Sequence, residues 1–436
     1  ENQDILSRFS QVFEQNYTRF LDLQKAEAQA REAQIEAALE KVRASGNALH
    51  HTSELVKTAS VMFNQLDELG IHPWRCGSAI VTEDEERLEL WSATTTPHER
   101  NVGVAGDTLI SGHWVTRGAY KAVKDQDPIY IYDLSGDKLI DYLQYISKNF
   151  SISESSQPED KLPERLVYNC AVFNRGVVYG AFLEPISTDI QNVLIRFAKV
   201  FEQAYTRFLD LQKAEAQARE AQIQAALERV RSRSMAMHKS EEMGEVIEVV
   251  FEQMVDLDLP VDHVGFILDY QERDDMHIWF ASKQVKPSEI TIPYFDSPHW
   301  NSFRKAKSKK QKFFTNLLDF ETKNKFYEEL FKHIPVLPNK ATKDIFKKPG
   351  LVISTALQDK VGLYFENYTQ VPFSDEQNEL LTRFAKVFEQ TYTRFLDLQN
   401  AEAQAREAQI EAALERVRSR TMAMHNSDEL GETAVV

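Results

Sequence analysis

One sixteen-residue segment occurs three times in this chain at nearly constant spacing. The copies are residues 24–39, 212–227 and 399–414; the first reads QKAEAQAREAQIEAAL, and any two copies differ at no more than two positions. They begin 188 and 187 residues apart. A fixed period of this length indicates a repeat array in which each period is one structural unit. The near-identical part is rich in Ala, Glu, Gln and Arg, which predicts a helix. The diverged part between copies is predicted to be a globular domain.

The predicted helices are much longer than the sixteen residues. Residues 188–237 contain neither Pro nor Gly. About fifty helical residues would form a rod of roughly 75 Å. A helix of that length without internal caps is typical of a coiled coil. The same pattern predicts helical linkers at residues 1–47 and 374–424.

Large apolar residues recur along the second linker with alternating spacings of three and four, followed by a stretch in which the apolar positions are alanines. This pattern predicts a parallel dimeric coiled coil. Two successive spacings of three, at residues 208, 211 and 214, form a stammer that changes the packing phase. The predicted interface residues are Leu194, Phe197, Phe201, Phe208, Leu211, Ala218, Ala221, Leu227 and Val230. The alternative is a rigid spacer, or a helix folded back on its own domain.

Between the linkers, each period has the same order of predicted elements. A helix (Glu54–Leu69, Glu241–Leu257) precedes a hairpin, an irregular middle and a closing hairpin, which indicates an α+β or α/β domain with a central antiparallel sheet of about six strands. The chain is therefore divided into linkers at 1–47, 188–237 and 374–424, domains at 48–187 and 238–373, and the start of a third unit at 425–436. We expect a piece of a longer array, with an output domain such as a kinase, cyclase or regulator beyond Val436.

Composition excludes several classes of function. The formal net charge of −16 argues against a nucleic-acid partner, which requires a basic surface. Cys76 and Cys170 are the two cysteines, too few for a disulfide framework. No apolar run approaches the roughly 20 residues that span a bilayer. We therefore expect a cytoplasmic protein without a membrane partner. No phosphate-binding loop, zinc motif or nucleophile elbow is present, which predicts that the chain is not an enzyme.

A segment near the end of the second domain resembles a known family. Residues 371–377 read VPFSDEQ and are followed by Leu380, Leu381, Phe384 and Ala385, which is similar to the closing signature of the GAF domain, a small sensory module. Residues 185–189 are a poorer copy. The Ala/Glu/Arg-rich linkers resemble signalling helices. The resemblance implies tandem GAF-like domains in a homodimer that relay signals without catalysis. The alternative is a structural scaffold or filament-like rod of degenerate GAF-like repeats that bind no ligand.

A histidine–tryptophan pair recurs in the irregular middle, where GAF-like folds enclose a ligand pocket. His113-Trp114 in the first domain corresponds to His299-Trp300 in the second. These four residues are the candidate ligand-binding residues, because an aromatic ring and an imidazole can hold a small planar molecule. The alternative is a structural Trp that anchors a helix, with a hydrogen-bonded His beside it. No metal or particular cofactor is implied. An open polar cavity at either pair would favour sensing, and a filled interior would favour the scaffold.

Overall fold

A computed structural model describes residues 2–49, 51–82, 84–94, 102–148, 163–283, 285–334 and 339–422. The chain divides into two compact units, Glu1–Ala216 and Gln217–Val436. One long helix crosses this division, so each half of that helix is described with its own unit. The third unit expected at 425–436 lies outside the described residues.

The first unit contains a six-stranded antiparallel sheet with the order β3-β2-β1-β6-β5-β4. Its helices are α1 (Asn2–Asn47), α2 (Leu55–Glu68), α3 (Trp114–Asp125), α4 (Asp137–Ser147) and the first half of α5 (Thr188–Met235). Its strands are β1 (Arg75–Val81), β2 (Arg87–Thr94), β3 (Val102–Leu109), β4 (Ile129–Ser135), β5 (Arg165–Phe173) and β6 (Gly176–Phe182).

The second unit repeats this topology, with the order β10-β11-β12-β7-β8-β9. After the second half of α5, its helices are α6 (Met243–Asp256), α7 (Pro298–Ser308), α8 (Phe320–Leu330), α9 (Asn339–Lys347) and α10 (Asp375–Met422). Its strands are β7 (His263–Leu268), β8 (Met276–Ser282), β9 (Ser288–Ile292), β10 (Phe313–Leu318), β11 (Leu351–Leu357) and β12 (Val361–Asn367). The predicted α+β class with a six-stranded antiparallel sheet is confirmed.

In both units the strands at the sheet edges come from the segment expected to be irregular. β3 and β4 are the edges of the first sheet, and β9 and β10 are the edges of the second. An edge strand is paired on one side and half exposed, so it lacks the continuous apolar run that marks a central strand. The central β6, by contrast, is buried at all seven positions.

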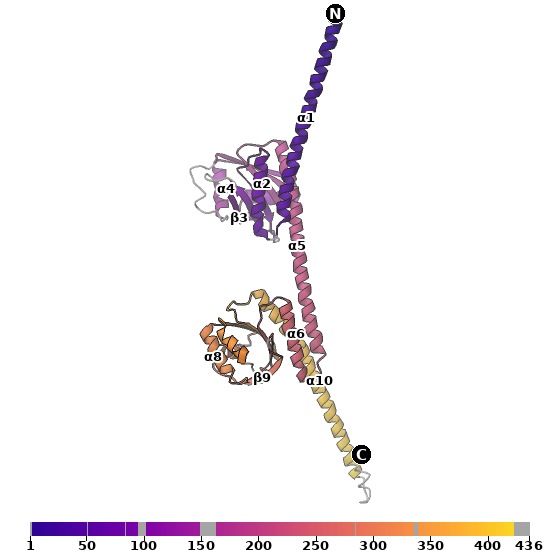
Figure 1. Cartoon of the computed structure of the whole chain (residues 1–436), viewed down its shortest axis with the longest axis vertical. Helices are drawn as coiled ribbons and strands as arrows, with labels where there is room; N and C mark the ends of the chain where they lie inside the picture. The colour runs from indigo at the N-terminus through magenta and orange to yellow at the C-terminus, as the bar shows by residue number, and fades with distance from the viewer. Residues whose placement is uncertain are drawn as a thin grey trace. The chain divides into compact units, whose positions relative to one another are not determined.

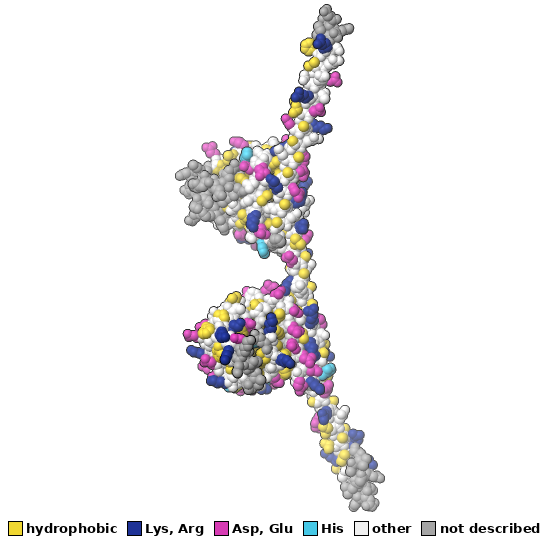
Figure 2. Space-filling model, in the orientation of Figure 1, with side chains coloured by type: hydrophobic (Ala, Val, Ile, Leu, Met, Phe, Trp, Pro, Cys, Tyr) yellow, Lys and Arg dark blue, Asp and Glu magenta, His cyan; other side chains and the backbone are white. Residues whose placement is uncertain are grey.

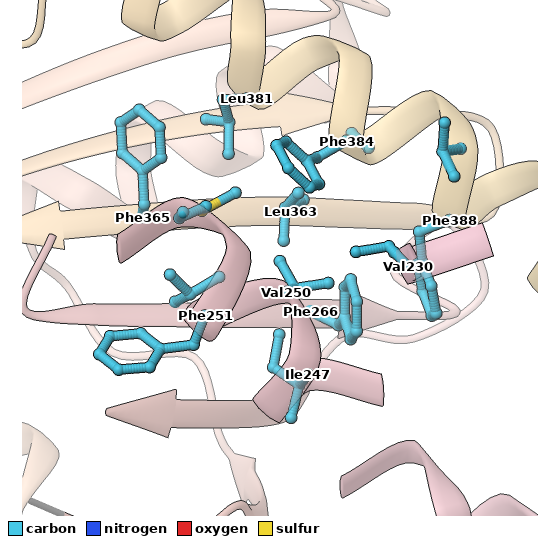
Figure 3. Close-up of a cluster of buried hydrophobic side chains, with 14 of the residues drawn as sticks. Val230, Ile247, Val250, Phe251, Phe266, Leu363, Phe365, Leu381, Phe384 and Phe388 are labelled. Atoms are coloured by element: carbon cyan, nitrogen blue, oxygen red, sulfur yellow. The ribbon is translucent and has the colours of Figure 1, made fainter. Parts of the chain in front are cut away.

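Each sheet lies between two layers of helices (Figure 1). In the second unit, α6, α10 and the second half of α5 cover one face, and α7, α8 and α9 cover the other. On the first face, the ring of Phe266 in β7 stacks on Phe388 of α10 with centroids 3.6 Å apart. Leu363 and Phe365 of β12 lie beside Leu381 and Phe384 of α10 (Figure 3). Two apolar cores, one on each face, therefore hold the second sheet.

The structure corrects the predicted coiled-coil interface. Leu194, Phe197, Phe201 and Phe208 are buried in the core of the first unit, and Leu227 and Val230 are buried in the core of the second. Six of the nine predicted interface residues thus pack against their own units, as in the alternative of a helix folded back on its domain. An amphipathic helix on a sheet and a coiled-coil helix share the same apolar spacing, so sequence alone could not separate them. Leu211, Ala218 and Ala221 are exposed.

The long helices overlap within each unit. In the first unit, the end of α1 (Ile35, Leu39 and Val42) shares a core with the beginning of α5. Arg196 of α5 donates to Glu32 of α1 at 2.7 Å, and in the second unit Arg383 of α10 donates to Glu220 of α5 at 2.6 Å. Each domain is therefore packed between the end of one long helix and the beginning of the next. Across the described ranges, no helix combines the length and apolarity needed to cross a membrane.

Candidate functional site

The second unit encloses a cavity of about 200 Å³ on the sheet face opposite α10. Its walls come from the sheet and from α7, α8 and α9. Most of the lining is apolar, including Ile267, Ile278, Ile290, Trp300, Phe326, Leu330 and Ile353. A mostly apolar cavity with a few placed polar groups is the usual form of a small-molecule site.

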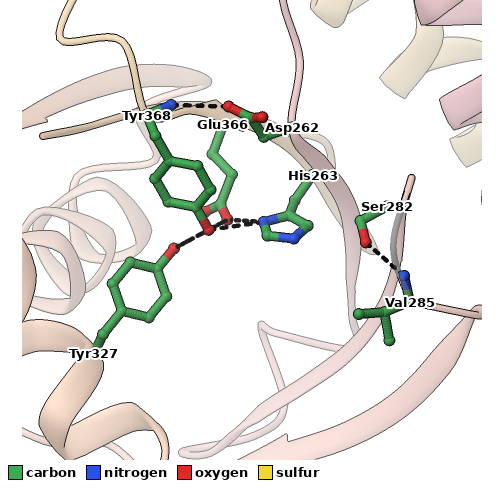
Figure 4. Close-up of polar contacts among 7 residues, drawn as sticks. All are labelled: Asp262, His263, Ser282, Val285, Tyr327, Glu366 and Tyr368. Atoms are coloured by element: carbon green, nitrogen blue, oxygen red, sulfur yellow. Dashed lines mark hydrogen bonds and ion pairs between the residues drawn. The ribbon is translucent and has the colours of Figure 1, made fainter. Parts of the chain in front are cut away.

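A carboxylate cluster forms the polar part of the lining (Figure 4). Glu366 of β12 is 8% exposed. Its Oε1 lies 2.6 Å from Nδ1 of His263, 3.1 Å from the Tyr327 hydroxyl and 3.3 Å from the Tyr368 hydroxyl. The two hydroxyls are 2.9 Å apart, and the Tyr368 amide donates to Asp262 at 3.0 Å. Three side chains, from β7, α8 and the residue after β12, thus converge on one carboxylate oxygen.

The two tyrosines act as hydrogen-bond donors in this cluster. Burial, together with the nearby Glu366 charge, raises the pKa of Tyr327 and of Tyr368 well above the usual range. Both phenols therefore keep their protons at neutral pH and can stabilise the buried carboxylate. Charge-assisted hydrogen bonds of this kind offset the desolvation of a buried charge.

His299 and Trp300 of α7 also line the cavity. Nδ1 of His299 lies 3.1 Å from Oδ1 of Asn316, and Nδ2 of Asn316 donates to the Ser302 hydroxyl at 2.8 Å. This network assigns the proton to Nδ1 and leaves Nε2 as an acceptor. Burial lowers the pKa of His299 to about 4, so the ring is neutral at pH 7. The Trp300 indole nitrogen is buried and has no hydrogen-bond partner among the described residues.

The equivalent histidine of the first unit has the opposite tautomer. His113 is the N-cap of α3: its Nδ1 accepts from the Val115 amide at 3.2 Å, and its Nε2 donates to Asp141 at 3.1 Å. In the second unit, Pro298 occupies the first turn and Ser297 caps α7, so the helix starts earlier and His299 is released from capping. Trp114 is 41% exposed, in contrast to the buried Trp300.

Aromatic side chains fill the corresponding interior of the first unit. Tyr132 of β4 stacks on Tyr168 of β5 with centroids 4.7 Å apart, and the Tyr132 hydroxyl lies 3.3 Å from that of Tyr142. Tyr132 and Tyr168 are paired in register, as Asn316 and Ile353 are in the second sheet. The smaller pair leaves open the space that two phenol rings occupy in the first unit.

The carboxylate cluster also has no counterpart in the first sheet. By strand register, Ala181 stands where the second unit has Glu366, and Arg75 stands where it has His263. Two units with one topology therefore differ in both the volume and the charge of this region.

Several solved structures resemble this chain. They include the GAF domain of an Acinetobacter phosphoenolpyruvate-protein phosphotransferase, at 12% identity, covering 39% of this chain and 92% of that one, with a TM-score of 0.25. Bacteriophytochrome RpBphP3 from R. palustris has 10% identity, with 76% and 61% covered and a TM-score of 0.31. The fRMsr of Staphylococcus aureus, in complex with substrate, has 18% identity, with 39% and 94% covered and a TM-score of 0.23.

At these identities the likeness concerns the fold and does not extend to ligand or activity. No family model and no curated protein matches the sequence.

The two units give different outcomes for the predicted ligand residues. His299 and Trp300 line an open cavity, whereas His113 is held in a filled interior and Trp114 is exposed. Sequence reasoning missed His263, Tyr327, Glu366 and Tyr368. The available signal was Glu366 within an otherwise mostly apolar central strand, because a carboxylate in such a strand requires a partner.

Neither cysteine is placed for nucleophilic chemistry. Cys76 and Cys170 are both buried, and burial raises the pKa of each thiol, to about 12 for Cys170. A thiol with a raised pKa is a poor nucleophile at neutral pH. Within the described part of the chain, no group of three or more His, Cys, Asp or Glu side chains is arranged to hold a metal ion.

Proposed function

We propose that this chain is a non-catalytic cytoplasmic sensor and relay, in which the second GAF-like domain binds a small molecule and passes its occupancy to the long helices and to an output domain outside this chain. The observation that carries the proposal is the cavity of about 200 Å³ beside Glu366. A dry cavity of about 150 Å³ is large enough for benzene, so this volume accommodates a ligand with one ring.

The lining indicates which ligand groups are favoured. The isoleucine and aromatic walls fit an apolar ring. Glu366 fits an N–H donor or a small cation, because a carboxylate is an acceptor with several lone pairs. The unpartnered indole nitrogen of Trp300 can donate to an acceptor on the same ligand. A ring that bears an amine or amidine group fits both the apolar walls and Glu366.

Two strands connect the cavity with the long helices. In β12, Glu366 faces the cavity while Leu363 and Phe365 pack against α10. In β7, His263 and Ile267 line the cavity while Phe266 stacks on Phe388. Side chains alternate between the faces of a strand, so a shift of either strand on ligand binding moves residues in both cores. We propose this as the relay, provided that the ligand has different affinities for two packings.

The first GAF-like domain supports a different role. Its tyrosine-filled interior favours the scaffold alternative for that domain, with Tyr132, Tyr142 and Tyr168 occupying the space a ligand would need. We propose that it holds the beginning of α5 in place and binds no ligand.

The homodimer is proposed through the exposed part of α5 that contains Leu211, Ala218 and Ala221. Small residues allow two helices to approach closely in a parallel pair. Sedimentation or light scattering would test this, because Leu211→Asp should lower the association of the whole chain. A chain that is already monomeric at micromolar concentration would contradict the dimer.

The cavity is tested by blocking it. Ile353→Trp places an indole into the cavity from β11, and Ile131→Trp makes the same change at a half-exposed position of the first domain. Benzylamine, benzamidine, benzyl alcohol and benzoate are added separately to the whole chain, and the thermal shift of its unfolding is measured for each. We expect benzylamine and benzamidine to stabilise the wild type and Ile131→Trp, with no shift in Ile353→Trp. Equal shifts in all three proteins, or none with any compound, would contradict the proposal.

A further inference from the structure

The first half of α1 carries five large apolar side chains that are exposed. Phe9 is 72% exposed, Val12 56%, Phe13 71%, Tyr17 53% and Phe20 53%. We call these five residues the α1 stripe. Figure 2 shows hydrophobic side chains along this bare part of the helix. A contiguous apolar surface of this kind marks an interaction site.

The same five residue types recur at the same repeat positions in the other two long helices, where they are buried. In α5 they are Phe197, Val200, Phe201, Tyr205 and Phe208, and in α10 they are Phe384, Val387, Phe388, Tyr392 and Phe395. These ten side chains are between 0% and 8% exposed. In each case the cover is the helix-facing side of the adjoining GAF-like sheet together with α2 or α6.

Two charged positions beside the stripe also have partners in the other helices. Glu202 accepts from the Asn174 amide at 3.1 Å, and Glu389 accepts from the Lys360 and Val361 amides, both at 3.1 Å. These amides lie at the turn of the closing hairpin. The equivalent residue in α1 is Glu14, which is exposed and has no hydrogen-bond partner among the described residues.

Arg8 is the second charged position. Its equivalents, Arg196 and Arg383, pair with Glu32 and Glu220 on the preceding long helix. Arg8 is exposed and has no ion-pair partner in the described ranges. The apolar stripe, the carboxylate and the guanidinium of α1 thus repeat three separate contacts that α5 and α10 make with a GAF-like unit.

We propose that the α1 stripe is the docking face for a further GAF-like unit, whose last strand leads into α1 as β12 leads into α10. That unit would cover the five apolar side chains with its sheet, offer hairpin amides to Glu14 and offer an acidic residue to Arg8. A second copy of this chain does not supply such a unit, because α5 and α10 already cover the helix-facing sides of its two sheets.

The chain itself provides the unit for a test. Residues 217–375 joined directly ahead of Glu1 place Phe9 at the distance from the last strand that Phe384 has in the second unit. In this fusion we expect amide hydrogen exchange over residues 9–20 to slow at least tenfold relative to the original chain, to the level of residues 384–395. A matched fusion with Phe9→Asp and Phe13→Asp should keep the fast exchange. Unchanged exchange in the first fusion would overturn the proposal.

Two further measurements guard against a fusion that does not fold. A second fusion carries residues 29–188 ahead of Glu1, which keeps the end of α1 that belongs to the core of the first unit and the same spacing; if neither added unit protects the stripe, the proposal fails. The original chain with Phe9→Asp and Phe13→Asp should keep the molar mass of the wild type in light scattering. A wild-type dimer that becomes monomeric in this variant would assign the stripe to a second copy and overturn the proposal.

Discussion

Three phenylalanines at one repeat position provide a sharp test of how the long helices pack. Phe13, Phe201 and Phe388 are equivalent in sequence, but their exposed fractions are 71%, 3% and 0%. Phe201 contacts Phe173 of β5 with centroids 5.5 Å apart, and Phe388 stacks on Phe266 of β7. The same substitution to alanine therefore removes a surface ring in one case and a core ring in the other two.

The expected magnitudes follow from this burial. A buried Phe→Ala change costs about 3–5 kcal/mol in the free energy of unfolding, because it loses transfer free energy and leaves a cavity. Phe201→Ala should therefore destabilise the first domain, and Phe388→Ala the second, each by about 3–5 kcal/mol. Phe13→Ala should change stability by less than about 0.5 kcal/mol, since a surface ring is replaced by a better helix former.

Hydrogen exchange of the whole chain separates the two domains, which a single melting curve would not do. Peptides from β6 report on the first domain and peptides from β12 on the second. Phe201→Ala should accelerate exchange in β6, and Phe388→Ala in β12, while Phe13→Ala changes neither. The packing described above would be refuted if the two core substitutions left their strands unchanged. A large effect of Phe13→Ala would show that the stripe is covered in the isolated chain.

Three further predictions concern the titratable side chains of His299, Glu220 and Glu366. Burial holds the pKa of His299 at about 4 against 6.5, so below pH 6.5 the unfolded state takes up a proton that the folded state does not. The free energy of unfolding of the second domain should therefore fall by up to about 3 kcal/mol between pH 6.5 and 4. In His299→Gln, denaturant unfolding should show a smaller fall over the same pH range. Identical pH profiles of the wild type and this variant would contradict the prediction. Hydrogen bonds from Arg383 and Gln224 lower the pKa of Glu220 to about 2, so any stability they add is lost as the pH falls from 4.5 towards 2. In Arg383→Ala, a carboxyl NMR titration should show the Glu220 pKa rising towards 4.5, and an unmoved titration would show that the ion pair is absent in solution. Glu366→Gln should remove the thermal shift caused by benzamidine, because the cation needs the carboxylate charge. An undiminished benzamidine shift would contradict the role of Glu366.

The central strands could be predicted from sequence, and the edge strands could not. Residues 351–357 and 361–367 are almost fully buried, which gives continuous apolar runs. β9 and β10 are short and half exposed, so their composition resembles that of a loop. The candidate site could be predicted only in part. His299 and Trp300 were found because the pair recurs, while Glu366 was missed because its partners come from strands and helices far apart in sequence.

The sequence by itself determined the period, the long helices and the α+β character of each domain, because repetition and local apolar spacing are properties of neighbouring residues. Tertiary structure alone decided what covers the apolar stripe of each long helix. Phe13, Phe201 and Phe388 have the same local surroundings in sequence, yet one is bare and two are in cores. Tertiary structure also decided which domain has a cavity. Whether space remains after folding depends on residues brought together across a sheet, such as Tyr132 with Tyr168 or Asn316 with Ile353. Burial is a property of the assembled fold, and no spacing within one helix or strand encodes it.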